Sequence, residues 1–532
     1  MNTAASTAAS VSPWSSLRHP PFRALWQSGT VYFLCNFMQT MAAAWMMVEL
    51  SGSSFLAALV QTAVFMPMFL LSLPAGVLAD TTDRRRLMFG ALCVQAATAA
   101  LLALLAFVGI AGPATVLFFI FVAGCCTAVL SPAWNSTIAD TMPRDELPQA
   151  ITAMSIAYNA ARAVGPALAG VVFSLIGGAW NFVAAVFGAL FLLQAVRRWP
   201  PQPHPPSRLP PERLWGGMLA GLRFARHSDA VLAQLVRTVA YSSAGSALWA
   251  LLPIIGPHQL SLGAAGVGLL MGCMGAGAVG AGLVLGRLRA SAGLEGLISG
   301  GCIAYAFSMV VSAWSKQWWL TYPALVLAGA AWMAVMATFN TATQTSSPQW
   351  VQARALAMHT LSALGSFAIG SAFWGALSDI AGLGFALSSA ALCMLGGLLL
   401  TRPFPLRMGE AQDVTLATRW DDFFVADEPE PDAGPVAVEI GYRIRAEHSA
   451  AFLNALTQLR APRRRDGATF WRVYRDLADP SRYVERFIVT SWADYLHQRA
   501  RTTLADQELE TRVRAFLLPG EAVTMQHFLA ER

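Results

Sequence analysis

The sequence predicts an all-α membrane protein with twelve transmembrane helices in two six-helix bundles, followed by a small α+β domain. Three observations lead to this prediction. Hydrophobic residues make up 55% of the 532 residues and charged residues only 12%, which is too apolar for an ordinary soluble chain. Long apolar runs recur up to residue 403, and a proline-rich segment interrupts them at the midpoint. The charged residues concentrate behind these runs, because residues 404 to 532 hold 37 of the 66 charged side chains.

The apolar runs have the length that a membrane span requires. A bilayer core needs roughly 20 apolar residues per helix, and no soluble fold is expected to bury twelve such runs. The bilayer is therefore a predicted partner. The runs lie near residues 24 to 48, 54 to 79, 88 to 110, 114 to 139, 148 to 176, 179 to 197, 230 to 254, 263 to 286, 294 to 314, 319 to 343, 350 to 378 and 382 to 401.

The basic residues between the runs predict the orientation. With the N-terminus in the cytoplasm, the inside segments hold sixteen arginines, whereas the outside loops hold only Lys316. Basic residues accumulate on the cytoplasmic side of membrane proteins. An even number of spans then returns the chain to its starting side, so both termini are expected in the cytoplasm.

A proline-rich segment divides the membrane part. Residues 198 to 213, RWPPQPHPPSRLPPER, contain seven prolines and cannot continue a helix. The predicted organisation is a cytoplasmic lead (1–23), an N-terminal six-helix bundle (24–197), a cytoplasmic linker (198–229), a C-terminal six-helix bundle (230–403), an acidic tether (404–435) and a soluble domain (436–532).

An internal repeat supports two related bundles. A shift of 205 residues places Asn135 on Asn340 and Pro143 on Pro348 without a gap. The same shift places Gly165 on Gly370, Gly170 on Gly375 and Ala150 on Ala355. Duplicated bundles of this kind place one binding site at their interface, near the bilayer midplane.

A cluster of acids and arginines separates the second and third runs. Residues 74 to 88 read PAGVLADTTDRRRLM and contain Gly76, Asp80, Arg84 and Arg85. This pattern, with MPRDEL after the fourth run and ARAVGPALAG in the fifth, resembles the major facilitator superfamily in its enterobactin-exporter-like, transmembrane secretion effector branch. The resemblance covers essentially the whole chain. Two positions depart from the superfamily pattern, which usually has a basic residue at Thr81 and a glycine at Asp83.

The resemblance implies a gate on the cytoplasmic side. In this superfamily the loop aspartate, here Asp80, caps the N-terminus of the eleventh helix near Trp350 when that side closes. Arg84 is then expected to pair with Asp140. A carboxylate at a helix N-terminus contributes roughly 0.3–1 kcal/mol. Control of topology alone remains a second interpretation of the arginines, but it does not explain Asp80, because acids contribute little to the orientation signal.

Polar residues within the spans are the candidates for substrate or ion binding. Arg162 lies well inside the fifth run, where a guanidinium costs about 2.5–3.5 kcal/mol on insertion scales. It is expected to bind an anionic substrate, to pair with a carboxylate or to have a structural role on backbone carbonyls. Further candidates are Asn36, Gln39, Asn159 and His359, although such residues often form hydrogen bonds between helices instead.

The fifth run also carries a small-residue motif, and the spans contain almost no acid. Gly165, Pro166 and Gly170 resemble the antiporter motif of the superfamily, and packing alone explains the glycines equally well.

Proton coupling is the usual energy source of such exporters, but the acids lie at span ends. His359, Glu49 or an end aspartate such as Asp379 is then the proton carrier, or the coupling differs. Seven tryptophans near span ends are expected mainly as interfacial anchors, with one or two available to line a cavity: Trp45, Trp134, Trp180, Trp249, Trp314, Trp318 and Trp319.

The tail has a different pattern of short mixed elements. Its order, β-α-β-β-α-β, suggests a ferredoxin-like fold, and DPSRYVERFIVTSWADYLHQ resembles antibiotic-biosynthesis-monooxygenase-like domains, which commonly dimerise through their sheets. His497, Trp471 and Trp492 are available for chemistry, but packing and capping explain them, so an interaction or regulatory role is favoured and no catalytic residue is assigned.

Two hypotheses follow from these patterns. The leading one is a secondary active, alternating-access exporter of a small hydrophobic or amphiphilic compound, drug-like or siderophore-like, in the bacterial inner membrane. The second is a membrane-anchored monooxygenase-like or ligand-sensing protein that acts through its tail. No phosphate-binding loop of a primary pump occurs in the chain. The seven cysteines fall inside apolar stretches without metal-ligand spacing, so neither a metal, a cofactor nor a nucleic-acid partner is expected.

Overall fold

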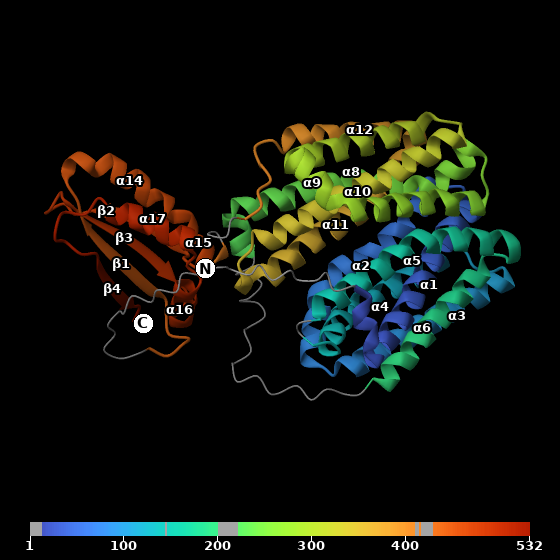
Figure 1. Ribbon diagram of the computed structural model, residues 1–532, viewed down its shortest axis with the longest axis horizontal. Coiled ribbons are helices and arrows are strands. Elements are labelled where there is room, and N and C mark those ends of the chain that lie inside the picture. The colour runs from blue at the N-terminus through green and yellow to red at the C-terminus, as the bar shows by residue number, and fades with distance from the viewer. Residues whose placement is uncertain (1–12, 144–145, 200–221, 410–413, 416–428, 532) are drawn as a thin grey trace, which may run out of the picture. The chain divides into compact units, whose positions relative to one another are not determined.

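The computed structural model describes residues 13–143, 146–199, 222–409, 414–415 and 429–531. The proline-rich segment from residue 200 and most of the acidic tether lie outside these ranges. Figure 1 shows α1 to α6 grouped together and α8 to α12 grouped together. After the short 3-10 helix η1 (Pro13–Arg18), the helices of the first group are α1 (Pro20–Ser51), α2 (Ser54–Thr81), α3 (Arg84–Val108), α4 (Pro113–Asp140), α5 (Leu147–Ile176) and α6 (Ala179–Arg198). Those of the second group are α8 (Asp229–Leu260), α9 (Ala264–Trp314), α10 (Trp318–Thr345), α11 (Gln349–Ala381) and α12 (Leu383–Leu400).

Among the described residues, eleven helices are long and apolar enough to cross a membrane. One of them, α9, has 51 residues, which is more than twice the length that a bilayer core requires. Gly293 interrupts this helix with φ 66° and ψ 176°, a conformation that glycine adopts without steric cost. The segments on either side of Gly293 coincide with the eighth and ninth predicted runs, so the helical ribbon accounts for twelve spans.

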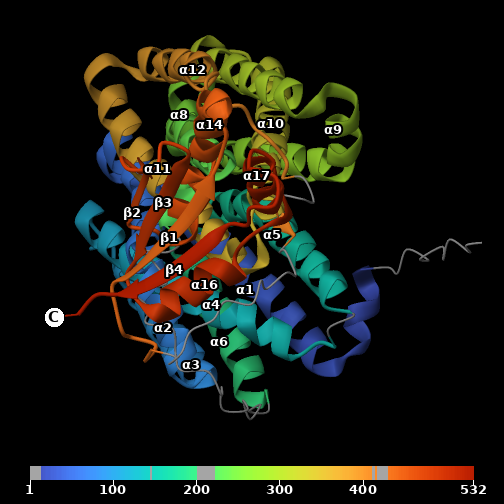
Figure 2. The same cartoon turned by 90° about the vertical axis from the view of Figure 1, so that its left-hand side faces the viewer.

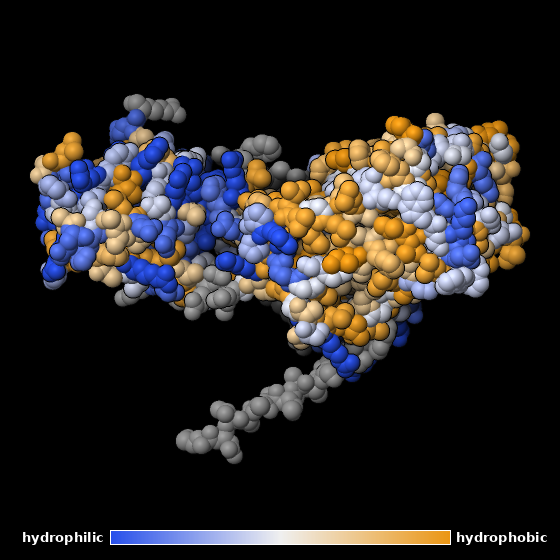
Figure 3. All heavy atoms as spheres, turned by 90° about the horizontal axis from the view of Figure 1, so that it is seen from above, coloured by the Kyte–Doolittle hydropathy of each residue, from blue (hydrophilic) through white to orange (hydrophobic). Residues whose placement is uncertain are grey.

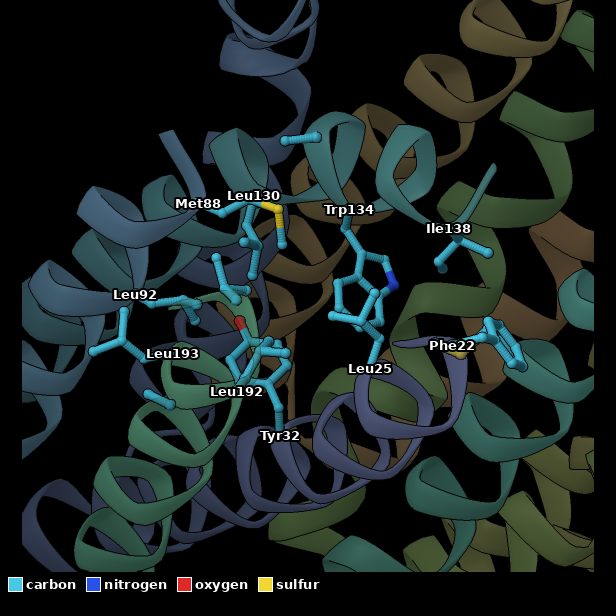
Figure 4. Packing of buried hydrophobic residues seen from close by; sticks show 14 of the residues in the cluster. Phe22, Leu25, Tyr32, Met88, Leu92, Leu130, Trp134, Ile138, Leu192 and Leu193 are labelled. Carbon is cyan, nitrogen blue, oxygen red and sulfur yellow. The ribbon is translucent and has the colours of Figure 1, made fainter. Parts of the chain in front are cut away.

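The interior of the first bundle is a continuous apolar core. Figure 4 shows Met88, Leu130 and Trp134 among the side chains that converge there from α1, α3, α4 and α6. Trp134 is 6% exposed and lies against Gly29, where an added Cβ would stand 2.7 Å from the indole ring. Glycine at position 29 therefore allows α1 to approach α4 across this ring.

Apolar side chains also cover the outside of the helical part. Figure 3 shows broad hydrophobic areas over the visible face of these helices. Leu283 is 84% exposed and Ile380 is 85% exposed, values that leucine and isoleucine rarely reach in soluble proteins except in isolation. A surface of this kind is suited to lipid rather than water.

The repeat seen in the sequence corresponds to repeated helix contacts. An added Cβ at Gly165 of α5 would stand 2.8 Å from Phe37 of α1, and one at Gly370 of α11 would stand 2.6 Å from the carbonyl oxygen of Ser243 of α8. Gly170 of α5 contacts the start of α9, and Gly375 of α11 contacts the start of α2. Residues 205 positions apart thus make equivalent contacts, as expected for two related bundles.

The C-terminal part contains one antiparallel sheet of four strands in the order β2-β3-β1-β4. Figure 2 shows the sheet with α14 and α17 along it. The strands β1 and β3 pair over their whole length, from Val436 with Val489 to Arg443 with Arg482. The order of elements agrees with the prediction. They are β1 (Val436–Arg443), α14 (Ser449–Gln458), α15 (Arg460–Asp466), β2 (Phe470–Arg475), β3 (Arg482–Val489), α16 (Trp492–Ala500), α17 (Leu504–Arg514) and β4 (Thr524–Leu529).

Candidate functional site

The loop between α2 and α3 holds its charges in local contacts. Asp83 is the N-cap of α3, because its carboxylate accepts hydrogen bonds from the backbone N–H groups of Arg85 (2.9 Å) and Arg86 (3.2 Å). The side chain of Arg85 donates to the carbonyl oxygen of Arg197 at the end of α6. The residue that departs from the superfamily pattern, Asp83, therefore has a structural role at the start of α3.

The predicted latch of this loop is only partly visible. Gly76 has no heavy atom within 4 Å of an added Cβ, and Arg84 is the first residue of α3. The side chains of Asp80 and Asp140 lie outside the described residues, so their expected partners stay predictions.

Arg162 lies where the two bundles meet. Its guanidinium carbon stands 4.5 Å from the ring centroid of Trp249, so α5 of the first bundle contacts α8 of the second. Trp249 is 8% exposed and is therefore an interior residue, not the interfacial anchor that its place in the sequence suggested. Among the described residues, no hydrogen-bond partner is present for its indole N–H.

Further aromatic rings continue from Trp249. Its ring centroid stands 6.5 Å from that of Trp332 on α10, which lies 5.8 Å from both Tyr305 and Phe367. Phe367 of α11 stands 4.9 Å from Phe65 of α2. This row of rings, called the aromatic cluster below, crosses from the second bundle to the first and places a large π surface beside the Arg162 charge.

The other intramembrane candidates have different surroundings. Gln39 is 1% exposed, and within the described part of the chain neither of its side-chain amide atoms has a hydrogen-bond partner. Asn36 is half-buried one turn earlier on α1. Asn159 donates to the carbonyl oxygen of Ser155 in its own helix at 2.8 Å. This contact is a structural one within the helix. His359 is 3% exposed within α11.

The fifth-helix motif is a packing site. Gly165 contacts α1, while Gly170 and the carbonyl oxygen of Pro166 contact Ala264 and Gly268 of α9. Small residues permit this approach because a side chain larger than hydrogen would meet the backbone of the neighbouring helix.

A second contact between the bundles is polar. Asp379, near the C-terminal end of α11, accepts hydrogen bonds from the hydroxyl of Ser53 at 2.5 Å and from the backbone N–H of Ser54 at 2.6 Å. These residues begin α2, so the carboxylate stabilises the positive end of that helix dipole. Nearby, the hydroxyl of Thr62 donates to the carbonyl oxygen of Ala368 at 2.8 Å. The N-terminal half of α2 is therefore held against the C-terminal half of α11.

A family model described as transmembrane secretion effector matches residues 11–532. The chain belongs to the transmembrane secretion effector family of major facilitator transporters. Its long apolar helices and apolar exterior agree with this membership.

Curated relatives of this transmembrane secretion effector are efflux and siderophore proteins by their names. It is 30% identical over 213 residues to the multidrug efflux pump Tap of Mycobacterium tuberculosis, a match covering 36% of this chain and 50% of that protein. It is 26% identical over 158 residues to the staphyloferrin A transporter of Staphylococcus aureus, covering 30% and 40% of the two chains. The chain thus spans about half or less of the length of the curated relatives it matches.

Solved structures show the same membrane fold. A bacterial homolog of the human lysosomal transporter Spinster superposes with a TM-score of 0.58 at 15% identity, over 74% of this chain and 97% of that one. A D-xylose-proton symporter superposes with a TM-score of 0.57 at 12% identity, over 73% and 98%. These likenesses establish the major facilitator architecture of the membrane part of this secretion effector.

The candidate residues of the tail have different surroundings. Trp471 donates its indole N–H to buried Glu485 at 2.8 Å, and Tyr442 donates its hydroxyl to the same carboxylate at 3.0 Å. Burial, followed by the Glu485 charge, raises the pKa of Tyr442. Trp492 packs against Tyr495 inside the domain core, with the two rings tilted by 36°, whereas His497 is exposed on α16. Trp471 and Trp492 therefore belong to the core of the domain, whereas His497 lies on its surface.

The same part of the molecule contacts the start of α11. The guanidinium of Arg501 lies 4.1 Å from the ring centroid of Trp350, and Phe224 stands 5.6 Å from the same ring. Arg223 donates to the carbonyl oxygen of Gly467 at 2.8 Å. The tail is thus connected to the helix whose N-terminus the Asp80 latch is predicted to meet.

Sequence reasoning did not single out Trp249 or Asp379 as contact residues. Trp249 resembles the exposed anchors in the sequence, and Asp379 lies 326 residues from its partner Ser53. The repeat carried the one available signal, because it predicted that the helices around positions 165–170 and 370–375 make corresponding contacts.

Proposed function

We propose that the chain is a secondary active exporter that moves a small hydrophobic or amphiphilic compound, drug-like or siderophore-like, by alternating access. The observation that carries the proposal is the Arg162–Trp249 contact. It places a charged group and an aromatic cluster between two related bundles, where transporters of this architecture bind substrate. The names of the curated efflux relatives support the outward direction.

Proton coupling and the cytoplasmic latch belong to the same proposal. Asp80 at the N-terminus of α11, with Gly76, Arg84, Arg85 and Asp140 around the loop, closes the cytoplasmic side in one state of the cycle. A carboxylate–dipole contact is weak enough to break in each cycle, at about 0.3–1 kcal/mol. The proton gradient supplies the energy, and the chain operates in the bacterial inner membrane.

Efflux from energised inverted vesicles tests the proposal. Vesicles containing the full chain should accumulate at least one dye from a panel of anionic, neutral and cationic fluorescent amphiphiles when a proton gradient is imposed, and a protonophore should abolish the accumulation. Asp80→Asn should reduce it strongly, whereas the matched exposed variant Asp83→Asn should affect mainly the stability of α3. Accumulation that persists without any gradient, or equal losses in both variants, would count against a proton-driven exporter with this latch.

A second role is proposed for the tail, as a regulatory or ligand-sensing module. The contact of Arg501 with Trp350 supports it, because a change in the tail then reaches the start of α11. A variant ending at residue 403 should still transport but should lose any regulation by the tail. Chemistry performed only by the tail, with no transport by the membrane part, would favour the membrane-anchored enzyme instead.

A further inference from the structure

The charge of Arg162 lacks a carboxylate partner in the described part of the chain. The titratable side chains close enough to act on it are Tyr158 and Tyr305, which are neutral in their ordinary state. Trp249 offers its ring face, which attracts a cation but does not neutralise it. Arg162 is half-buried, and a guanidinium withdrawn from water normally has an anionic or hydrogen-bonding partner, because leaving it alone in a low-dielectric region is costly.

The internal repeat offers a comparison for this charge within the same chain. The repeat shift of 205 residues places Arg162 on Phe367, which occupies the equivalent position on α11. Phe367 makes apolar ring contacts with Phe65 and Trp332. An aromatic side chain therefore satisfies this position in one half of the molecule, so architecture alone does not explain an arginine in the other half.

Another arginine within a span has a partner of a different kind. Arg237 of α8 donates to the carbonyl oxygen of Phe404 at 2.7 Å, which is a structural use of a guanidinium. Arg162 instead lies over an indole ring. A ring face attracts a cation without using its N–H groups in conventional hydrogen bonds, so a guanidinium over a ring can still donate two parallel hydrogen bonds to a carboxylate.

Buried polar groups without partners occur on the neighbouring helices. These are the indole N–H of Trp249 and both amide atoms of Gln39, within the described residues. Each buried polar group without a partner costs about 1–3 kcal/mol. The Trp249 N–H belongs to the ring over which Arg162 lies. A ligand with an acidic group and further acceptors could therefore pair with the guanidinium and also accept a hydrogen bond from this N–H.

We infer that the substrate is an anion, a compound with a carboxylate that pairs with Arg162 and an aromatic or other flat apolar part that packs against Trp249 and the aromatic cluster. The inference rests on the proposed transport function and narrows its substrate class. It makes Arg162 a specificity-determining residue. Cationic drugs, which need an acid in the site, are then poor substrates.

A series of probes that differ only in charge tests this inference. Pyrenebutyrate, pyrenebutyramide and pyrenebutylamine share one apolar part and are anionic, neutral and cationic at pH 7. Binding to the purified full chain is followed by the thermal shift and by energy transfer from tryptophan to pyrene. The anion should bind at least about tenfold more tightly than the amide, the effect of one charge-assisted pair, and the amine should bind least.

Variants assign the preference to Arg162. Arg162→Phe, which copies the repeat, should abolish the preference for the anion, and Arg162→Lys should keep part of it. Arg289→Gln is the matched control, because Arg289 already donates to the hydroxyl of Thr338 at 3.1 Å. This variant should leave the preference for the anion unchanged. Equal affinity for all three probes, a preference for the amine, or failure of the anion to bind would each overturn the inference.

The inference and the proposed function fail in different ways. If vesicles export a neutral or cationic dye of the panel but pyrenebutyrate is neither bound nor exported, the exporter stands and the anionic substrate class is wrong. If pyrenebutyrate binds with the predicted dependence on Arg162 while no probe crosses the membrane, the site stands and the exporter is wrong.

Discussion

Neutralising Asp379 should weaken the contact between α2 and α11 on the side predicted to face outward. Its carboxylate joins the hydroxyl of Ser53 and the backbone N–H of Ser54 across the bundle interface. Asp379→Asn keeps the size of the side chain but removes the negative charge at the N-terminus of α2. The state in which this end is closed should therefore lose stability relative to the state in which it is open.

The magnitude follows from the geometry and the exposure of the contact. A hydrogen bond to a charged group contributes about 1.5–3 kcal/mol when water is excluded. Asp379 is exposed, so water competes, and a carboxylate at an exposed helix N-terminus contributes about 0.3–1 kcal/mol. Asp379→Asn keeps one acceptor oxygen, so the variant loses the charge and one of the two hydrogen bonds. The expected cost is about 0.5–1.5 kcal/mol, which shifts the equilibrium toward the open state by roughly 2- to 13-fold.

Hydrogen exchange of the full chain in nanodiscs measures this shift. Opening of the interface should raise exchange not only at the start of α2 but also where Thr62 meets Ala368 and where Gly170 of α5 meets the start of α9. Glu49→Gln is the matched control, because Glu49 accepts a hydrogen bond from Trp45 within α1 at 2.8 Å and does not bridge the bundles.

The pattern of exchange decides the outcome. Faster exchange confined to Ser53 and Ser54 would mean that Asp379 is only a local cap, and the reasoning about the gate would be wrong. Equal effects of Glu49→Gln and Asp379→Asn would mean that charge on this side, rather than the contact, sets the equilibrium. A double-mutant cycle with Ser53→Ala then gives the coupling energy of the pair itself.

Three further predictions concern other contacts. Gly275→Val should force α9 away from Ala163 of α5 and reduce transport severely. The control Gly280→Val should leave transport unchanged, because an added Cβ at Gly280 has open space around it. Similar losses of transport in both variants would contradict the packing argument. Arg501→Gln should raise hydrogen exchange at the start of α11 by severing the contact with Trp350, without unfolding the sheet of the tail, and unchanged exchange there would refute the link. Burial, and secondarily the charge of Arg499, holds the pKa of His527 below its ordinary value of about 6.5. The folding stability that neutral His527 contributes is therefore complete above about pH 6.5. It is lost as the pH falls through the lower folded-state pKa. Exchange protection of β4, corrected for intrinsic rates, should therefore fall in mild acid in the wild type and fall less in His527→Gln.

The membrane fold could be predicted from the sequence because each span carries its own signal. An apolar run of about 20 residues specifies a helix in lipid whatever its neighbours are. Even the break at Gly293 falls between two predicted runs, in a segment that contains Arg287 and Arg289. The tail was predictable for a related reason, since its alternating strands and amphipathic helices follow one another in a regular order.

The site could be predicted only in part, because its chemistry depends on pairs far apart in the chain. Arg162 was identifiable as a costly intramembrane charge, and Gln39 as a buried amide. No periodicity indicates that Arg162 meets Trp249, or that Asp379 meets Ser53. Burial also separates tryptophans that look alike in sequence, since Trp249 is 8% exposed and Trp314 is 66% exposed.

Duplication and divergence together explain why these two charges matter. The glycine contacts are the same in both halves, so packing alone would make the two bundle interfaces equivalent. The charges break that symmetry, because the repeat places Arg162 on Phe367 and Asp379 on Ser174. We therefore expect the double variant Arg162→Phe with Asp379→Ser, which makes each half resemble the other, to keep its fold and its thermal stability. Such a chain should lose the preference for anions and the bias toward the closed state together, and loss of folding instead would mean that the asymmetric charges serve the architecture.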